Sequence, residues 1–87
     1  MEQIECVAIR RWADSEAWSL PRPARHGDVM HVVFDETGGL STAQFEQGFL
    51  TTTGRFVNRQ EAFVIAQEAG QLLEDDTGKT LFSEDVW

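Results

Sequence analysis

The chain has 87 residues, 41% of them hydrophobic, and carries 15 Asp and Glu against seven Lys and Arg, a formal net charge of -8 at pH 7. This length supports one core, so residues 1–87 are expected to form a single domain. The charge argues against binding of long nucleic acids, whose phosphates attract clustered Lys and Arg. No apolar run resembles a membrane span or a signal peptide, and the single cysteine, Cys6, cannot form an internal disulfide. We therefore expect a cytoplasmic protein with no membrane partner.

The large apolar side chains favour self-association. Three tryptophans and six phenylalanines are more apolar surface than one small core readily hides. A core of this size leaves little net stability, and association is a common way to bury further surface. We therefore expect a homo-oligomer, with the N-terminal strand and an alanine-rich helix face as its contact surfaces.

The chain begins with two predicted strands. Residues 3–9 alternate and are rich in β-branched side chains, which predicts a strand with Ile4, Cys6 and Ala8 on one face. Residues 12–25 contain two tryptophans and then two prolines, which lack the N–H that a strand interior needs. A short second strand followed by a loop is expected here.

A helix and a hairpin are predicted next. In residues 24–34 the apolar side chains recur at helical spacing, although the valines in this segment would also suit a strand. Residues 35–43 contain paired glycines and small polar residues and are expected to be a loop. Residues 44–57 are typical of a β-hairpin with Gly54 near its bend.

The strongest signals predict a second helix. Asn58 can cap it, Glu61 three residues later completes a capping box, and Gly70 can end it in a left-handed conformation. The helix carries a narrow stripe of small and apolar side chains suited to close packing. The stripe consists of Ala62, Ile65, Ala66 and Ala69.

The tail is predicted to return to the core. An acidic loop at residues 74–77 and a turn at Gly78 lead to Trp87, whose large indole we expect to be packed rather than free. Taken together, these elements predict an α+β fold in which a small antiparallel β-sheet packs with two α-helices.

No catalytic or metal-binding pattern stands out. His26 and His31, with the nearby Asp28, could be proposed as zinc ligands, but the two histidines lie five residues apart, on different faces of a helix, and no cysteine or third histidine lies close. The chain has no nucleophile elbow and no Gly-rich phosphate loop. We assign no catalytic residue, no metal and no cofactor, and expect a protein that is not an enzyme.

Residues 47–59 hold the most informative cluster. Two aromatics, three threonines, two glycines and two arginines precede a helix N-terminus, where free N–H groups favour an anion. Phe can stack on a base, Arg can clamp phosphate and Thr can bond to ribose or phosphate oxygens. We expect Arg55 and Arg59 to approach one pyrophosphate and expect removal of Arg59 to leave the fold intact. The alternative is a packed hairpin whose threonines pair across strands and whose arginines meet nearby carboxylates.

Four segments of this sequence resemble a family of small phage proteins. They are Arg25-His26 with Asp28 and His31, residues 47–62, residues 69–71 and residues 81–87. The resemblance is to the first-described Thoeris anti-defence family. Members of that family are nucleotide sponges: they sequester the glycocyclic ADP-ribose signal made by a bacterial TIR-domain enzyme, and some also hold cyclic oligonucleotides at a separate site.

The resemblance implies an antiparallel sheet with two helices, a hexamer built from dimers, and ligand pockets at subunit boundaries. It also implies a protein of the infected host's cytoplasm that binds a small cyclic nucleotide without cleaving it. The alternative function is an acidic inhibitor that covers a basic site on a host protein. The candidate ligand-binding residues, from the cluster and the resemblance together, are Arg25, His26, Phe49, Thr51, Thr53, Arg55, Phe56 and Arg59.

Overall fold

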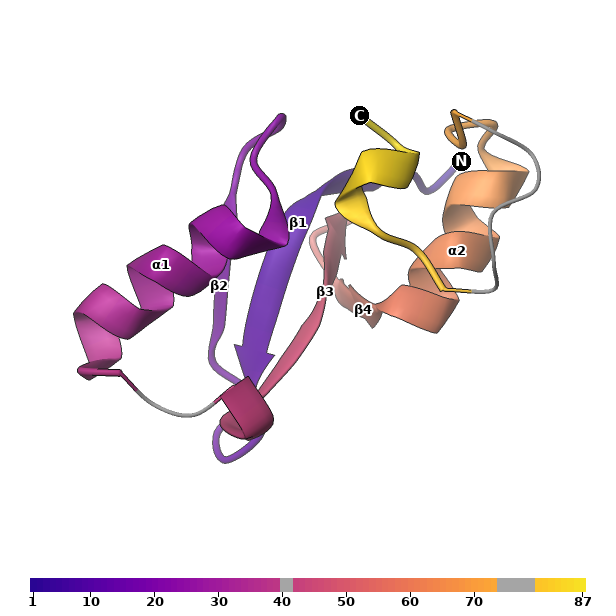
Figure 1. The fold of residues 1–87 in the computed structure, drawn as a ribbon. Coiled ribbons are helices and arrows are strands. Elements are labelled where there is room, and N and C mark those ends of the chain that lie inside the picture. The colour runs from indigo at the N-terminus through magenta and orange to yellow at the C-terminus, as the bar shows by residue number, and fades with distance from the viewer. Residues whose placement is uncertain (40–41, 74–79) are drawn as a thin grey trace.

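The computed structural model describes residues 1–39, 42–73 and 80–87, and Figure 1 shows the arrangement of its elements. The strands are β1 (Ile4–Arg11), β2 (Ala17–Leu20), β3 (Phe45–Thr51) and β4 (Phe56–Asn58), and they form one antiparallel sheet in the order β2-β1-β3-β4. The helices are α1 (His26–Thr37) and α2 (Arg59–Glu68), with the short 3-10 helices η1 (Thr42–Gln44) and η2 (Ser83–Asp85). The predicted α+β class, an antiparallel sheet with two helices, is confirmed. No helix within the described ranges is both long and apolar enough to cross a membrane.

Strand β1 lies in the middle of the sheet and contains an irregularity. Its register against β3 shifts between Ile4 and Cys6, so Ile4 joins Val7 in the core. Because side chains alternate along a strand, Cys6 and Ala8 lie on the other face, and the prediction that Ile4 shares their face is wrong. The side chain of Gln71 bonds to Ile4 here: its Oε1 accepts from Ile4 N at 2.7 Å and its Nε2 donates to Ile4 O at 2.9 Å.

Both helices cover the same face of the sheet. Val29 and Val33 of α1 and Ala62 and Ala66 of α2 belong to one buried cluster with the β1 side chains that include Val7. We call the opposite face of the sheet the open face. The alanine-rich side of α2 packs inside the chain, with Ala62 and Ala66 fully buried, so the prediction that it is a contact surface between subunits is wrong.

The two helices differ in how well the sequence predicted their ends. Helix α2 begins as expected: Asn58 Oδ1 accepts from Glu61 N at 2.8 Å, and Glu61 Oε1 accepts from Asn58 N at 3.0 Å. Helix α1 runs to Thr37, so the loop predicted over residues 35–43 is wrong for its first three residues. The helix ends where Gly38 adopts a left-handed conformation with φ 79°. Residues 40 and 41 lie outside the described residues.

The C-terminal segment, residues 80–87, links the beginnings of the two helices. Leu81 is fully buried, and its N–H donates to Arg59 O at 3.0 Å. Trp87 Nε1 donates to Ala24 O at 3.1 Å, just before α1, which confirms that the tail is packed. The yellow segment in Figure 1 accordingly lies between α1 and α2. The predicted acidic loop at residues 74–77 and the turn at Gly78 fall outside the described residues.

Candidate functional site

The structure divides the eight candidate residues into three groups. The first group lies beneath and beside the C-terminal segment, the second surrounds the carboxylate of Glu2, and the third is a single residue on the open face. The first consists of Arg25, His26, Phe49 and Arg59, the second of Thr51, Thr53 and Arg55, and the third of Phe56.

His26 and Phe49 form the buried part of the first group. His26 Nε2 donates to the carbonyl oxygen of Gly48 at 2.7 Å, and its ring meets Phe49 edge to face, with centroids 4.9 Å apart. Phe49 is fully buried and also meets the ring of Trp87. Burial lowers the pKa of His26 to about 4, with the charge of Arg59 acting in the same direction, so the ring is neutral at pH 7. These two residues therefore hold α1 and the C-terminal segment against the sheet.

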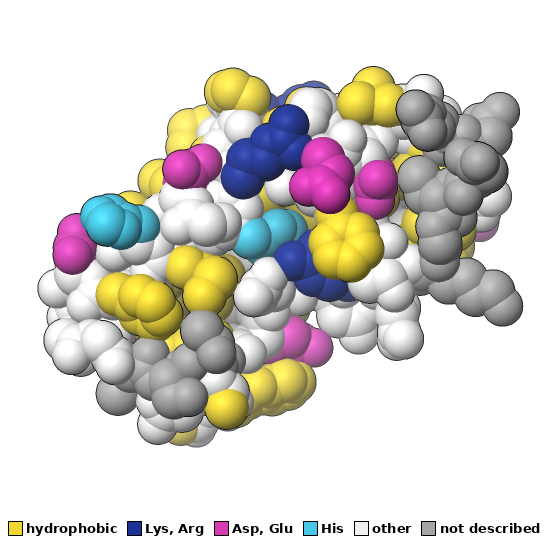
Figure 2. All heavy atoms as spheres, in the orientation of Figure 1, with side chains coloured by type: hydrophobic (Ala, Val, Ile, Leu, Met, Phe, Trp, Pro, Cys, Tyr) yellow, Lys and Arg dark blue, Asp and Glu magenta, His cyan; other side chains and the backbone are white. Residues whose placement is uncertain are grey.

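Two arginines hold the C-terminal segment by its main-chain carbonyl groups. Arg25 Nη2 donates to Trp87 O at 2.6 Å, and Arg59 Nη1 donates to Leu81 O at 2.7 Å. The carboxylate of Glu84 lies 4.0 Å from Arg25. Figure 2 shows this side of the molecule, where basic side chains, in dark blue, lie beside a histidine, in cyan, and acidic side chains, in magenta. The expectation that removal of Arg59 leaves the fold intact stays a prediction, and the bond of its guanidinium to this segment is what the removal would cost.

The second group is organised around a carboxylate of the chain itself. Arg55 Nε and Nη2 donate to the two carboxylate oxygens of Glu2 at 2.7 and 2.9 Å. The hydroxyls of Thr51 and Thr53 donate to Glu2 Oε2 at 2.6 and 2.9 Å. The bond from Arg55 is the largest cause that lowers the pKa of Glu2 to about 2. Arg55 is thus engaged as the alternative interpretation expected, and Arg55 and Arg59 contact different partners instead of converging on one point.

Phe56 lies on the open face, away from the other candidates. Its ring crosses Gly48, since a Cβ added at Gly48 would lie 2.5 Å from Phe56 Cζ. The guanidinium of Arg10 stands over the same ring, 4.6 Å from its centroid. The hairpin therefore places Phe56 and Phe49 on opposite faces of the sheet.

A polar pocket with a volume of about 260 Å³ opens at the N-terminus of α2. Of the eight candidates, Arg59 is the one that lines it. Its Nη2 donates to Gln47 Oε1 at 2.5 Å, and its guanidinium lies 4.6 Å from the ring centroid of Phe82. The described residues that line it are Glu46, Gln47, Asn58, Arg59, Gln60 and Thr80.

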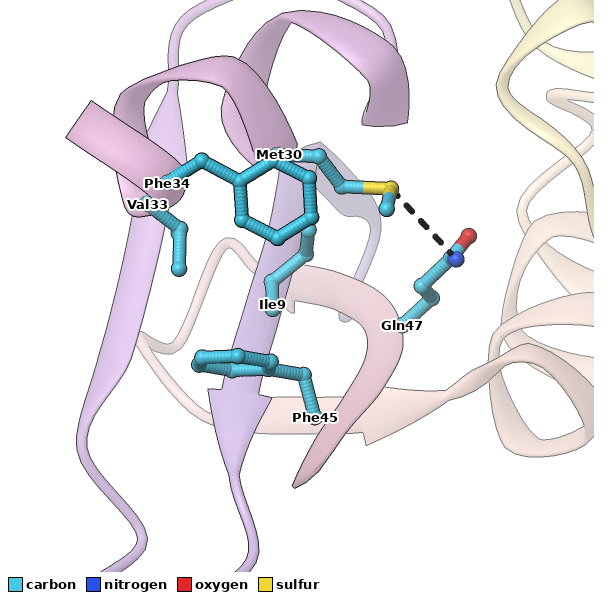
Figure 3. A pocket seen from close by; sticks show the side chains of 6 residues that line it. All are labelled: Ile9, Met30, Val33, Phe34, Phe45 and Gln47. Carbon is cyan, nitrogen blue, oxygen red and sulfur yellow. Dashed lines mark hydrogen bonds between the residues drawn. The ribbon is translucent and has the colours of Figure 1, made fainter. Parts of the chain in front are cut away.

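An apolar crevice between α1 and the sheet borders this pocket (Figure 3). Its free volume is about 10 Å³, room for about one water molecule and too little for a ligand. Gln47 belongs to both places: its Oε1 accepts from Arg59, and its Nε2 lies 3.7 Å from Met30 Sδ. The crevice is lined by Ile9, Met30, Val33, Phe34, Phe45 and Gln47.

The other pocket residues are not among the eight ligand-binding candidates that the sequence suggests. Gln47 did carry a signal, because it is the polar residue between Phe45 and Phe49 on the core-facing side of a strand. Thr80 could not be found in this way, because its place depends on how the C-terminal segment packs. Among the described residues, no group of three or more His, Cys, Asp or Glu side chains is placed to hold a metal ion.

Comparison with models of protein families matches residues 3–87 to the Phage T4 y16D protein family. The chain belongs to that family. No curated protein and no solved structure matches it. Membership of the y16D family supports the expected phage origin. It does not test the resemblance to the Thoeris anti-defence family, which stays a prediction.

Proposed function

We propose that this phage protein binds a small nucleotide anion at the pocket around Arg59 and holds it without cleaving it. In the infected host, the proposed role is to sequester a cyclic nucleotide immune signal such as glycocyclic ADP-ribose. Cyclic oligonucleotides are a second ligand class for the same function. The geometry of Arg59 is the observation that carries the proposal.

Arg59 has a positive charge that no ion pair within 4.0 Å neutralises in the described part of the chain, and the carboxylates of Glu84 and Asp85 act on it from a longer distance. Its guanidinium bonds to the Leu81 carbonyl and to the Gln47 amide, both uncharged, and no carboxylate of the described residues lies within 4.0 Å of it. The side chain is half-buried and lies in the first turn of α2, where the helix dipole also attracts an anion. A phosphate in the pocket would form charge-assisted bonds with this group.

The remaining pocket lining suits a polar ligand with many hydroxyl groups. Gln47, Gln60 and Thr80 offer amide and hydroxyl groups of the kind that bind ribose and base edges. Glu46 is the one acid among the described residues of the lining, and Arg10 Nη2 lies 2.5 Å from its carboxylate. Among the lining residues that the structure describes, Arg59 is then the charged one without an ion-pair partner.

Binding without cleavage fits the state of the nearby histidine. His26 is neutral, is bonded to Gly48 and is packed against Phe49, so it acts as a structural group in this account rather than as a general acid or base. The pocket is slightly smaller than the sites that usually enclose ligands of this size, which run from about 300 to 1,000 Å³. A pocket completed by a second subunit, as the resemblance implies, would enclose the ligand more fully.

Calorimetry with purified glycocyclic ADP-ribose, and separately with a cyclic dinucleotide, tests the proposal. Arg59→Ala should weaken binding roughly tenfold to a hundredfold, the loss of about 1.5 to 3 kcal/mol expected for a bond to a charged group. Circular dichroism must show that the variant is folded, and Arg59→Lys, which keeps the charge, should bind with intermediate affinity.

Arg55→Ala is the matched control, because Arg55 contacts Glu2 rather than the pocket. It should bind the nucleotide as the parent does. If folded Arg59→Ala bound the nucleotide as tightly as the parent, the pocket around Arg59 would not be the binding site. No heat with any nucleotide would favour the alternative function, an acidic inhibitor of a host protein.

A further inference from the structure

Gln47 holds the guanidinium of Arg59 at the edge of the pocket. It lies on β3 between Phe45 and Phe49, and because side chains alternate along a strand, it faces the same side of the sheet as these two rings. Its Oε1 accepts from Arg59 Nη2 at 2.5 Å, and its Nε2 lies 3.7 Å from Met30 Sδ, the contact dashed in Figure 3. A guanidinium only donates, so the amide oxygen is the end that must face Arg59. Both ends of the amide are therefore engaged, and its orientation is fixed.

Arg59 is held from several sides by groups that carry no charge. Besides the amide of Gln47, the carbonyl oxygen of Leu81 accepts from Nη1 at 2.7 Å, and the ring centroid of Phe82 lies 4.6 Å from Arg59 Cζ. Burial is the largest influence on the pKa of Arg59 and lowers it, because these neutral groups do not replace the water that the charge has lost. A side chain positioned in this way loses little conformational entropy when an anion binds to it.

A carboxylate in the place of the Gln47 amide would remove the available charge. Arg10 shows this arrangement beside the pocket, where its guanidinium pairs with Glu46 at 2.5 Å. Gln and Glu side chains have the same shape and present the same accepting oxygen to a guanidinium, but only Glu adds a negative charge. The residue type at position 47 therefore decides whether Arg59 has charge to offer to a ligand.

We propose that Gln47 is the residue that makes this pocket select anions. It positions Arg59 through an uncharged hydrogen bond, so that the positive charge stays available for a phosphate group of the ligand. This inference rests on the proposed function, because it concerns the same site and the same class of ligand. Gln47 is a positioning residue, which acts on the ligand through Arg59.

Two substitutions separate the charge of the pocket from the hydrogen bond of Gln47. Gln47→Glu keeps an oxygen on Arg59 but neutralises it, and calorimetry should show binding of inorganic pyrophosphate and of glycocyclic ADP-ribose weakened roughly tenfold or more. Gln47→Met removes the bond but keeps the charge, and it should weaken binding about fivefold. Urea unfolding at pH 7 should place Gln47→Glu close to the parent and Gln47→Met below it. Affinity and stability then fall in opposite orders, whereas a purely structural role would make them fall in the same order.

Gln60→Glu is the matched control for the added charge. Gln60 lines the same pocket at an exposed position, and the substitution changes the charge by the same amount. The expected loss of affinity is about twofold, because solvent and salt screen an exposed charge.

The outcomes separate this inference from the proposed function. A folded Gln47→Glu that binds as tightly as the parent, or no more weakly than Gln60→Glu, would overturn the inference and leave the proposed function standing. A parent that binds neither probe would overturn both. If Gln47→Glu does not fold, Gln47→Met decides: a fivefold loss supports the inference, and affinity equal to that of the parent contradicts it, because Arg59 would then need no positioning by Gln47.

Discussion

Gly48 is the residue at which the two faces of the sheet depend on each other. Its carbonyl oxygen accepts the bond from His26, which anchors the start of α1. Its missing side chain leaves the space in which the ring of Phe56 lies on the open face. Only glycine meets both needs, because a Cβ here would meet the Phe56 ring and the carbonyl oxygen of Val57.

The first prediction follows from this crowding. Gly48→Ala should destabilise the protein by about 1 to 3 kcal/mol, the usual cost of an overpacked site. Gly27→Ala is the control, because no heavy atom lies within 4 Å of its added Cβ and Gly27 lies in the first turn of α1. Alanine there should raise stability by up to about 1 kcal/mol. Urea unfolding followed by tryptophan fluorescence measures both, and a Gly48→Ala variant as stable as the parent would contradict the packing described.

His26 predicts a specific pH dependence of stability. Its pKa falls from 6.5 to about 4 on folding, so the unfolded chain takes up a proton that the folded one does not. The contribution of His26 to the free energy of unfolding is therefore fully present above pH 6.5. As the pH falls towards 4, up to about 3 kcal/mol of it is lost. The lowered carboxyl pKa values of Glu2 and Asp14, both about 2, act only below about pH 4.5.

Measuring the free energy of unfolding between pH 7 and pH 4.5 separates the effect of His26 from the effects of Glu2 and Asp14. His26→Gln keeps an N–H donor for the Gly48 carbonyl but has no titrating ring, so its stability should change little across this range. His31→Gln, at an exposed position of α1, should keep the pH dependence of the parent. A parent whose stability is flat across the range would show that His26 is not buried as described.

At the scale of elements, the sequence predicted the helix ends that depend on neighbouring residues in the chain and missed those that depend on contacts between elements. The capping box of Asn58 and Glu61 fixes the start of α2, and both bonds are present. The end of α1 was missed, because residues 35–37 are polar and precede paired glycines, which is typical of a loop. In the structure Glu36 Oε2 accepts from Trp18 Nε1 at 2.6 Å, a contact between elements that the local pattern does not contain.

The candidate site was predicted less completely than the fold. Because side chains alternate along a strand, Phe49 and Phe56 lie on opposite faces of the sheet. Arg55 bonds to the carboxylate of Glu2, which lies 53 positions earlier in the chain. Arg25 and Arg59, by contrast, come to hold the same segment, because residues 81–87 fold back between the helices. Residue types near one another in sequence could thus suggest a chemistry but could not show which groups would share a surface.

At the scale of the whole molecule, the one-sided placement of the helices creates two different surfaces. The polar pocket around Arg59 lies at the N-terminus of α2. The open face carries the neutral aromatic cluster around Arg10. The two surfaces meet at Glu46, which pairs with Arg10 and also lines the pocket.

The recovery of the signal molecule tests the central claim of sequestration most directly. Glycocyclic ADP-ribose is mixed with excess protein, free ligand is separated by ultrafiltration, and the retained protein is heated and analysed by chromatography. We expect the signal to vanish from the filtrate in proportion to the protein and to return intact after denaturation. A signal that stays in the filtrate, or one that returns as cleavage products, would contradict the account.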